Sequence, residues 1–132
     1  MFLLNTSALV STARYTTRLR LADYMTYNEI PELNKKQLRK FNRKYKLLKC
    51  SNYKKTSCWL WSGSKSLTGY GQVSLNNRLY TAHRVSYHIF KGKVPPDMQL
   101  DHLCMVRHCV NPKHLEPVTA IENVRRSILL RR

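Results

Sequence analysis

The sequence predicts a small α+β domain that is stabilised by zinc and preceded by a basic helical extension. Three observations predict this class: a change of residue pattern at Cys58, a dense group of Cys, His, Asn and Asp side chains at residues 101–123, and a large positive charge. A chain of 132 residues suits one ordinary domain, and at this size a bound metal adds appreciable stability. We expect an extension over residues 1–52 and the compact domain over residues 53–132.

The charge of the chain is strongly positive. It contains 24 Lys and Arg residues against 7 Asp and Glu residues, a formal net charge of +17 at pH 7, and no acidic residue falls between Leu33 and Pro96. A field of this kind attracts nucleic acid, because each neutralised phosphate releases a condensed counterion. Solubility alone does not call for such a surplus, so nucleic acid is the expected partner.

The first residues allow two interpretations. Residues 1–22 are basic, rich in Ser and Thr, and free of acidic residues. This is the composition of a mitochondrial transit peptide and also of an arm that lies along nucleic acid. We find no convincing signal peptide and no apolar run of about 18 residues, so no membrane partner is expected. We expect an intracellular protein, in the cytoplasm of a bacterium or a phage-infected cell, with an organelle as the alternative.

A basic helix is expected at the end of the extension. Leu33, Leu38, Phe41, Tyr45 and Leu48 recur at helical spacing, and Lys and Arg occupy most positions between them. This pattern predicts an amphipathic helix of about 14 residues, roughly four turns.

Short strands and one helix are expected next. CWLWSG, which begins at Cys58, and GYGQVSLN alternate apolar and polar residues, and Asn76-Asn77 forms a hairpin turn before RLYTA. The pattern predicts a small antiparallel sheet. In AHRVSYHIFKG the apolar residues share one helical face, and Gly92 is placed to end that helix.

The last unit is predicted to run strand, loop, strand, helix. MQLDHL is the first strand, CMVRHCVNPK the loop and HLEPV the second strand. The final helix begins at TAIENVRRSILL, where Thr119 and Glu122 match a T-x-x-E capping box. Asn123 then lies in the first turn, facing the first strand.

The loop carries a candidate zinc site. Cys104, Cys109 and His114 form C-x4-C-x4-H, and thiolates with an imidazole are the ligands that tetrahedral zinc prefers. Cys58 is our candidate for the fourth ligand of a closed, structural site. The other candidates are Cys50, His108 and His83. Two cysteines in a loop could also be ordinary buried thiols or, under oxidising conditions, a disulfide.

His102 is a candidate general base beside that site. Strand alternation points its side chain away from the face of Asp101 and Leu103. A neutral imidazole can take a proton from water near pH 7. Asp101 and Asn123 offer the oxygen ligands that suit Mg²⁺.

The string DHLC-x4-CVNPxHL, followed by Asn123, resembles the His-Cys box homing endonucleases and, more broadly, the HNH or ββα-metal nucleases. The resemblance covers roughly residues 58–126, including the CWLW, GYG and AHR segments. It implies a ββα-metal fold in which His102 activates the attacking water and Asn123 binds a catalytic Mg²⁺ or Mn²⁺. It also implies that Cys104, Cys109 and His114 bind zinc together with an upstream cysteine.

The resemblance extends to further residues. Asp101 matches a metal ligand of some members. Arg84 is the candidate for holding the scissile phosphate, because the family uses an arginine that reaches in from the sheet; the alternative is an ordinary surface arginine. A backbone carbonyl or Asn111 would orient the ring of His102. In the plainer HNH pattern His114 belongs to the catalytic ion, but we assign it to zinc because the two cysteines need a partner.

The expected function is hydrolysis of DNA to 5′-phosphate and 3′-hydroxyl ends. One alternative is an inactive, zinc-stabilised nucleic-acid-binding protein of a ribosome or packaging complex. Another is a nuclease directed at RNA. One active site cuts one strand, so a double-strand break needs a homodimer or two separate cleavage events.

Overall fold

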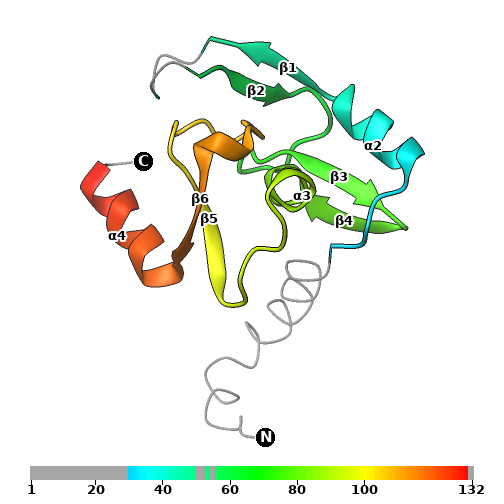
Figure 1. Cartoon of the computed structure of the whole chain (residues 1–132). Helices are drawn as coiled ribbons and strands as arrows, with labels where there is room; N and C mark the ends of the chain where they lie inside the picture. Colours follow the sequence, from blue (N-terminus) through cyan, green and yellow to red (C-terminus); the bar gives the residue numbers. More distant parts are fainter. Residues whose placement is uncertain (1–29, 50–52, 54–55, 131–132) are drawn as a thin grey trace, which may run out of the picture.

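The computed structural model describes residues 30–49, 53 and 56–130 (Figure 1). In chain order the elements are α2 (Lys35–Asn42), β1 (Tyr45–Leu48), β2 (Cys58–Trp61), β3 (Gln72–Leu75), β4 (Arg78–Thr81), α3 (Ala82–Phe90), β5 (Met98–His102), the 3₁₀ helix η1 (Pro112–His114), β6 (Leu115–Thr119) and α4 (Ala120–Leu130). The strands form three antiparallel pairs, β1 with β2, β3 with β4 and β5 with β6. The predicted α+β class is confirmed. No helix among the described residues is long and apolar enough to cross a bilayer.

The basic segment after Leu33 is a short helix followed by a strand. Helix α2 begins with a capping box, in which Asn34 and Gln37 each accept a hydrogen bond of 2.9 Å from the other's backbone N–H. It ends at Asn42, and Tyr45 then pairs with Trp61 across β1 and β2. The predicted 14-residue helix is therefore wrong beyond its first half. The ring of Tyr45 stacks on Trp59 at 4.8 Å, and such cross-strand aromatic contacts stabilise paired strands.

The CWLW segment, β2, pairs with this basic segment and not with the strand that follows it, so the predicted single sheet is also wrong. The remaining predictions for this region are confirmed. Asn76 and Asn77 both have positive φ angles, 51° and 64°, and they form the turn of the β3–β4 hairpin. Helix α3 is followed by Gly92 with φ 103°, a conformation that glycine adopts without steric strain.

The main core lies where α2, β2, the β3–β4 hairpin and α3 meet. Its buried members are Phe41, Trp61, Leu75, Tyr80, Ala82, Val85 and Val110. Gly71 lets the chain approach the indole ring of Trp61, because a Cβ atom at this position would lie 2.6 Å from that ring. The predicted domain boundary at residue 52 stays a prediction. Phe41 from the predicted extension nevertheless packs with Trp61, their rings 5.0 Å apart.

The β5–β6 hairpin lies between two helices (Figure 1). Helix α4 contacts one face of β5 through an ion pair of Arg126 with Asp101, and α3 contacts the other face through the pair of His83 with His102. The predicted order of strand, loop, strand and helix is confirmed. The Thr119 hydroxyl accepts a hydrogen bond of 3.1 Å from the Glu122 N–H, which is one half of the predicted capping box. Alternation along β5 therefore sends neighbouring side chains to different helices.

Candidate metal centre and catalytic cluster

Four side chains converge where β2 meets the loop after β5. Cys58 begins β2, Cys104 and Cys109 lie in the loop, and His114 ends η1. One ligand atom of each lies within 4.8 Å of all the others. Each residue is at most 2% exposed, and none of the three cysteines forms a disulfide in the described part of the chain. A buried Cys3His cluster of this kind could hold a metal such as zinc. Among the described residues, neither His108 nor His83 belongs to it, and Cys50 lies outside those residues.

Backbone hydrogen bonds bring Cys58 to this loop. The Trp61 N–H donates to the His108 carbonyl at 2.9 Å, and the Val110 N–H donates to the Trp59 carbonyl at 2.8 Å. A side-chain hydrogen bond adds to this connection, because the Asn111 side-chain nitrogen donates to the carbonyl of Ser57 at 2.6 Å. β2 and the loop are therefore joined on both sides of Cys109.

The donor chemistry of the four residues fits zinc. The hydrogen bond that the Cys104 thiol donates to the neighbouring Cys109 sulfur, together with burial, raises the pKa of Cys104. A bound divalent cation reverses this trend, because coordination favours the thiolate form. The His114 Nδ1 atom lies 3.6 Å from the Cys109 sulfur, and its Nε2 atom lies 2.6 Å from the Thr56 hydroxyl. An outer partner of this kind orients a histidine ligand so that Nδ1 can face the metal.

His102 lies at the end of β5, where a backbone carbonyl contacts its ring. Its Nε2 atom is 3.1 Å from the Cys109 carbonyl oxygen, which can only accept a hydrogen bond, so Nε2 carries the proton and Nδ1 keeps the lone pair. The residue is 6% exposed. The ring is therefore oriented by a backbone carbonyl. Asn111, the alternative candidate, contacts Ser57 and the Lys113 N–H in the described part of the chain.

The oxygen donors Asp101 and Asn123 both face the interface between β5 and α4. The Asp101 carboxylate, with a side chain 2% exposed, binds Arg126 at 2.9 Å. The Asn123 side-chain nitrogen donates to Gln99 at 2.7 Å, a bond that does not use its oxygen. A carboxylate and an amide oxygen on one face suit a hard cation such as Mg²⁺. His102 lies on the opposite face of the same strand.

Arg126 is the main functional neighbour that the sequence analysis missed. Its guanidinium binds Asp101, Glu122 at 2.8 Å and Glu116 at 2.6 Å. These hydrogen bonds raise the pKa of Arg126, and the bond to Asp101 has the largest effect. The spacing of Glu122 and Arg126, four residues apart on a helix, was a visible signal for the first pair. Nothing local in the sequence indicated the contact with Asp101.

His83 is a second neighbour of His102, and its sequence position indicated only an alternative zinc ligand. Its ring lies 4.6 Å from that of His102, and the Tyr70 ring lies within 6 Å of both histidines, at 5.6 and 5.8 Å. Burial, with smaller effects of His102 and Arg84, holds the pKa of His83 well below its usual range. His83 is therefore neutral at pH 7 and adds no charge beside His102.

Arg84 occupies a different setting from the one the resemblance implied. It is the third residue of α3, so it does not reach in from a strand. It is also 2% exposed, so it is not an ordinary surface arginine. A role in binding the scissile phosphate stays a prediction.

The comparisons with known proteins bear on the segment that carries these residues. Residues 80–125 match the model of the HNH endonuclease family. The chain is also 36% identical over 66 residues to Protein 7.7 of Escherichia phage T7, a match that covers 50% of this chain and 51% of that protein. The chain thus spans about half the length of this relative, and no solved structure matches it significantly. Residues 80–125 of this chain, which include His102 and Asn123, are therefore similar to the HNH endonuclease family.

Proposed function

We propose that this chain is a metal-dependent endonuclease that hydrolyses phosphodiester bonds of DNA. One observation supports it above all: at the end of β5 the Nε2–H of His102 is bound to a backbone carbonyl, and the preceding residue in the sequence, Asp101, shares the β5–α4 interface with Asn123. A base and two oxygen donors for a hard cation are the groups that hydrolysis of a phosphodiester requires. The family match at residues 80–125 supports the same activity.

Each side chain has a role in the proposed reaction. The Nδ1 atom of His102 takes a proton from the attacking water. The phosphorus gains the water oxygen, its bond to the 3′ oxygen breaks, and that oxygen leaves with a proton as the 3′ hydroxyl, so the phosphate stays on the 5′ end. Asp101 and Asn123 would hold Mg²⁺ or Mn²⁺, which supplies stabilisation of negative charge on the leaving oxygen. Arg84 is the residue proposed to hold the scissile phosphate.

The cysteine cluster has a separate, structural role in this proposal. Four protein ligands, Cys58, Cys104, Cys109 and His114, leave no open position for water on a tetrahedral zinc. The Cys109 residue joins the two sites, because its sulfur belongs to the cluster and its carbonyl orients His102. Zinc would therefore hold the general base in place without touching the substrate. Clustered cysteines that bind a metal also favour a reducing, intracellular setting.

The rival function is an inactive, zinc-stabilised protein that only binds nucleic acid. The positive charge and the cysteine cluster fit this function equally well. Binding alone does not call for a buried carboxylate beside an oriented histidine, so the enzyme is the better proposal. Duplex DNA is the proposed substrate, and a homodimer is the proposed form for cutting both strands.

A comparison of three substrates tests the function. The zinc-loaded chain is incubated with supercoiled plasmid, single-stranded DNA and structured RNA, with and without Mg²⁺. Nicked or linear plasmid should form only with the cation, and the new ends should be substrates for a ligase, because they carry 5′ phosphate and 3′ hydroxyl groups. Preferential cleavage of RNA would redirect the proposal to RNA, and no cleavage of any substrate would leave the binding protein as the function.

Arg126→Gln should make the stability of the chain more dependent on Mg²⁺. Without the guanidinium, the buried Asp101 carboxylate loses its ion-pair partner. Because Arg126 is partly exposed, we expect this loss to lower the free energy of unfolding by about 1–3 kcal/mol. A cation bound at Asp101 would replace that charge, so Mg²⁺ should raise the melting temperature of the variant more than that of the parent. Arg125→Gln is the matched control, because Arg125 pairs with Glu122 on the exposed side of α4. An equal Mg²⁺ response in both variants would contradict cation binding at Asp101.

A further inference from the structure

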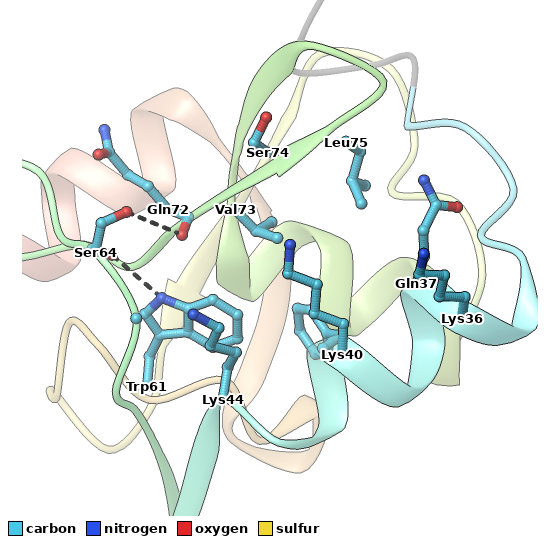
Figure 2. A pocket seen from close by; sticks show the side chains of 12 residues that line it. Lys36, Gln37, Lys40, Lys44, Trp61, Ser64, Gln72, Val73, Ser74 and Leu75 are labelled. Carbon is cyan, nitrogen blue, oxygen red and sulfur yellow. Dashed lines mark hydrogen bonds between the residues drawn. The ribbon is translucent and has the colours of Figure 1, made fainter.

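A groove with a basic rim lies between α2 and β3 (Figure 2). Lys36, Lys40 and Lys44 line it on one side, and Ser74 lies on the other. The buried rings of Phe41 and Trp61 form part of its apolar floor, and its volume is about 410 Å³. None of the residues assigned above to the metal centre or to catalysis lines it.

The three lysines are arranged in a row. Lys36 and Lys40 are four residues apart on α2 and so share one face, about 6 Å apart along the axis at a rise of about 1.5 Å per residue. Lys44 continues the row directly after the helix, where its N–H still donates to the Phe41 carbonyl. In Figure 2 the side chains of Lys40 and Lys44 point toward Val73 and Trp61. A row of cations along an open groove suits a linear chain of anionic groups better than a single small ion.

The walls of the groove are held by local contacts. Gln37 on α2 donates to Asn76 in the β3–β4 turn at 3.2 Å, which fixes the helix against the hairpin. On the floor, the Trp61 indole N–H donates to the Ser64 carbonyl at 3.2 Å, and a Cβ atom at Gly63 would lie 2.7 Å from that indole nitrogen. A pre-organised groove binds without a large cost in conformational entropy.

The positive charge of the groove is not neutralised within the described part of the chain. The ion pairs formed among residues 30–49, 53 and 56–130 involve His88, Arg125 and Arg126, and none involves a lysine of the groove. The sequence between Leu33 and Pro96 also contains no Asp or Glu. The charge is therefore available for an external polyanion, and its neutralisation would release counterions.

We propose that this groove binds the phosphate backbone of DNA at a distance from the scissile bond, with phosphates on the lysines and sugar groups against the apolar floor. The proposal deepens the proposed nuclease function and rests on it for the identity of the ligand. Strand β2 relates the two sites, because Trp61 lines the groove and its backbone N–H donates to His108 in the zinc loop. Backbone contacts of this type position a duplex without reading its sequence.

Two triple variants of the full chain test the groove. Lys36→Gln/Lys40→Gln/Lys44→Gln removes the row that lines it. Lys35→Gln/Arg39→Gln/Arg43→Gln removes three positive charges from the same segment at residues that do not line the groove. All six side chains are exposed, so neither variant should lose its fold, which thermal unfolding checks. Binding of a fluorescein-labelled 30-base-pair DNA duplex is measured by anisotropy at several salt concentrations, without added Mg²⁺.

The groove variant should bind the duplex at least ~10-fold more weakly near physiological salt. The slope of the logarithm of its binding constant against the logarithm of salt concentration should fall in magnitude by about 2–3, since each lost phosphate contact contributes about 0.9. The loss of duplex affinity in the control variant should be several-fold smaller. Equal losses would overturn the proposal, and so would a groove variant that binds DNA normally but loses affinity for polyglutamate. Because no cleavage is measured, a differential loss of binding supports the groove even if the chain proves not to be a nuclease.

Discussion

Cys109→Ser should release the bound zinc and unfold the loop between β5 and β6. The residue is fully buried, its sulfur is one of the four converging ligand atoms, and the Asn111 N–H also donates to it at 3.5 Å. A serine oxygen is a much poorer zinc ligand than a thiolate, and the free energy of binding structural zinc is on the order of 10 kcal/mol. Loss of even half of this binding free energy approaches the entire free energy of unfolding of a small domain. Zinc content per chain and thermal unfolding measure the effect.

Two matched variants separate the ligand set from its neighbours. His108→Gln changes a half-buried imidazole in the same loop, and Cys50→Ser changes the remaining cysteine. Both variants should keep one zinc per chain. Loss of zinc from either would show that the ligand set includes a different residue. A Cys109→Ser chain that is stable and zinc-free and still cleaves DNA would show that the cysteines are incidental.

Apart from Cys58, the parts of the site that the sequence predicted are those defined by short spacing. Cys104, Cys109 and His114 lie within eleven residues of one another, so a loop can bring them together whatever the rest of the fold does. His102 and Asp101 are neighbours on a strand, and alternation alone sends them to opposite faces. Such local rules do not depend on tertiary packing.

The parts that the sequence did not predict depend on distant packing. The helical pattern through Tyr45 fitted a helix, but pairing with β2 and stacking on Trp59 made that segment a strand. Tertiary contacts of this kind outweigh helix propensity, which is worth less than about 1 kcal/mol per residue. The contacts of His83 with His102 and of Arg126 with Asp101 join residues 19 and 25 positions apart, so no periodicity in the sequence records them.

In the proposed mechanism the two sites are coupled in one direction. The carbonyl that contacts His102 belongs to Cys109, so loss of zinc should displace the proposed general base. No ligand atom of the zinc cluster comes from His102, so a change of its imidazole leaves the four ligands in place. Stability and metal content can therefore be read independently of activity when His102 is changed.

His102→Ala should abolish cleavage of supercoiled plasmid while the chain keeps its fold and its zinc. Removal of a general base lowers the rate by about 10²–10⁴-fold, which is below detection in a plasmid assay. Because His102 is buried, the alanine variant also leaves a cavity against His83 and Tyr70 that will lower stability. His102→Asn is the companion variant, since its side chain fills more of that space and cannot act as a base near pH 7.

His88→Gln is the matched control for the loss of His102, since it changes a histidine of α3 that pairs with Glu32. The control should cleave at the parental rate, and both variants at position 102 should carry one zinc and bind the duplex as the parent does. This pattern separates chemistry from binding, because a residue that acts only in proton transfer affects turnover and leaves duplex affinity unchanged. Near-normal cleavage by His102→Asn would remove His102 from the mechanism. Joint loss of zinc and cleavage by both variants at position 102 would instead make His102 a structural residue of the loop.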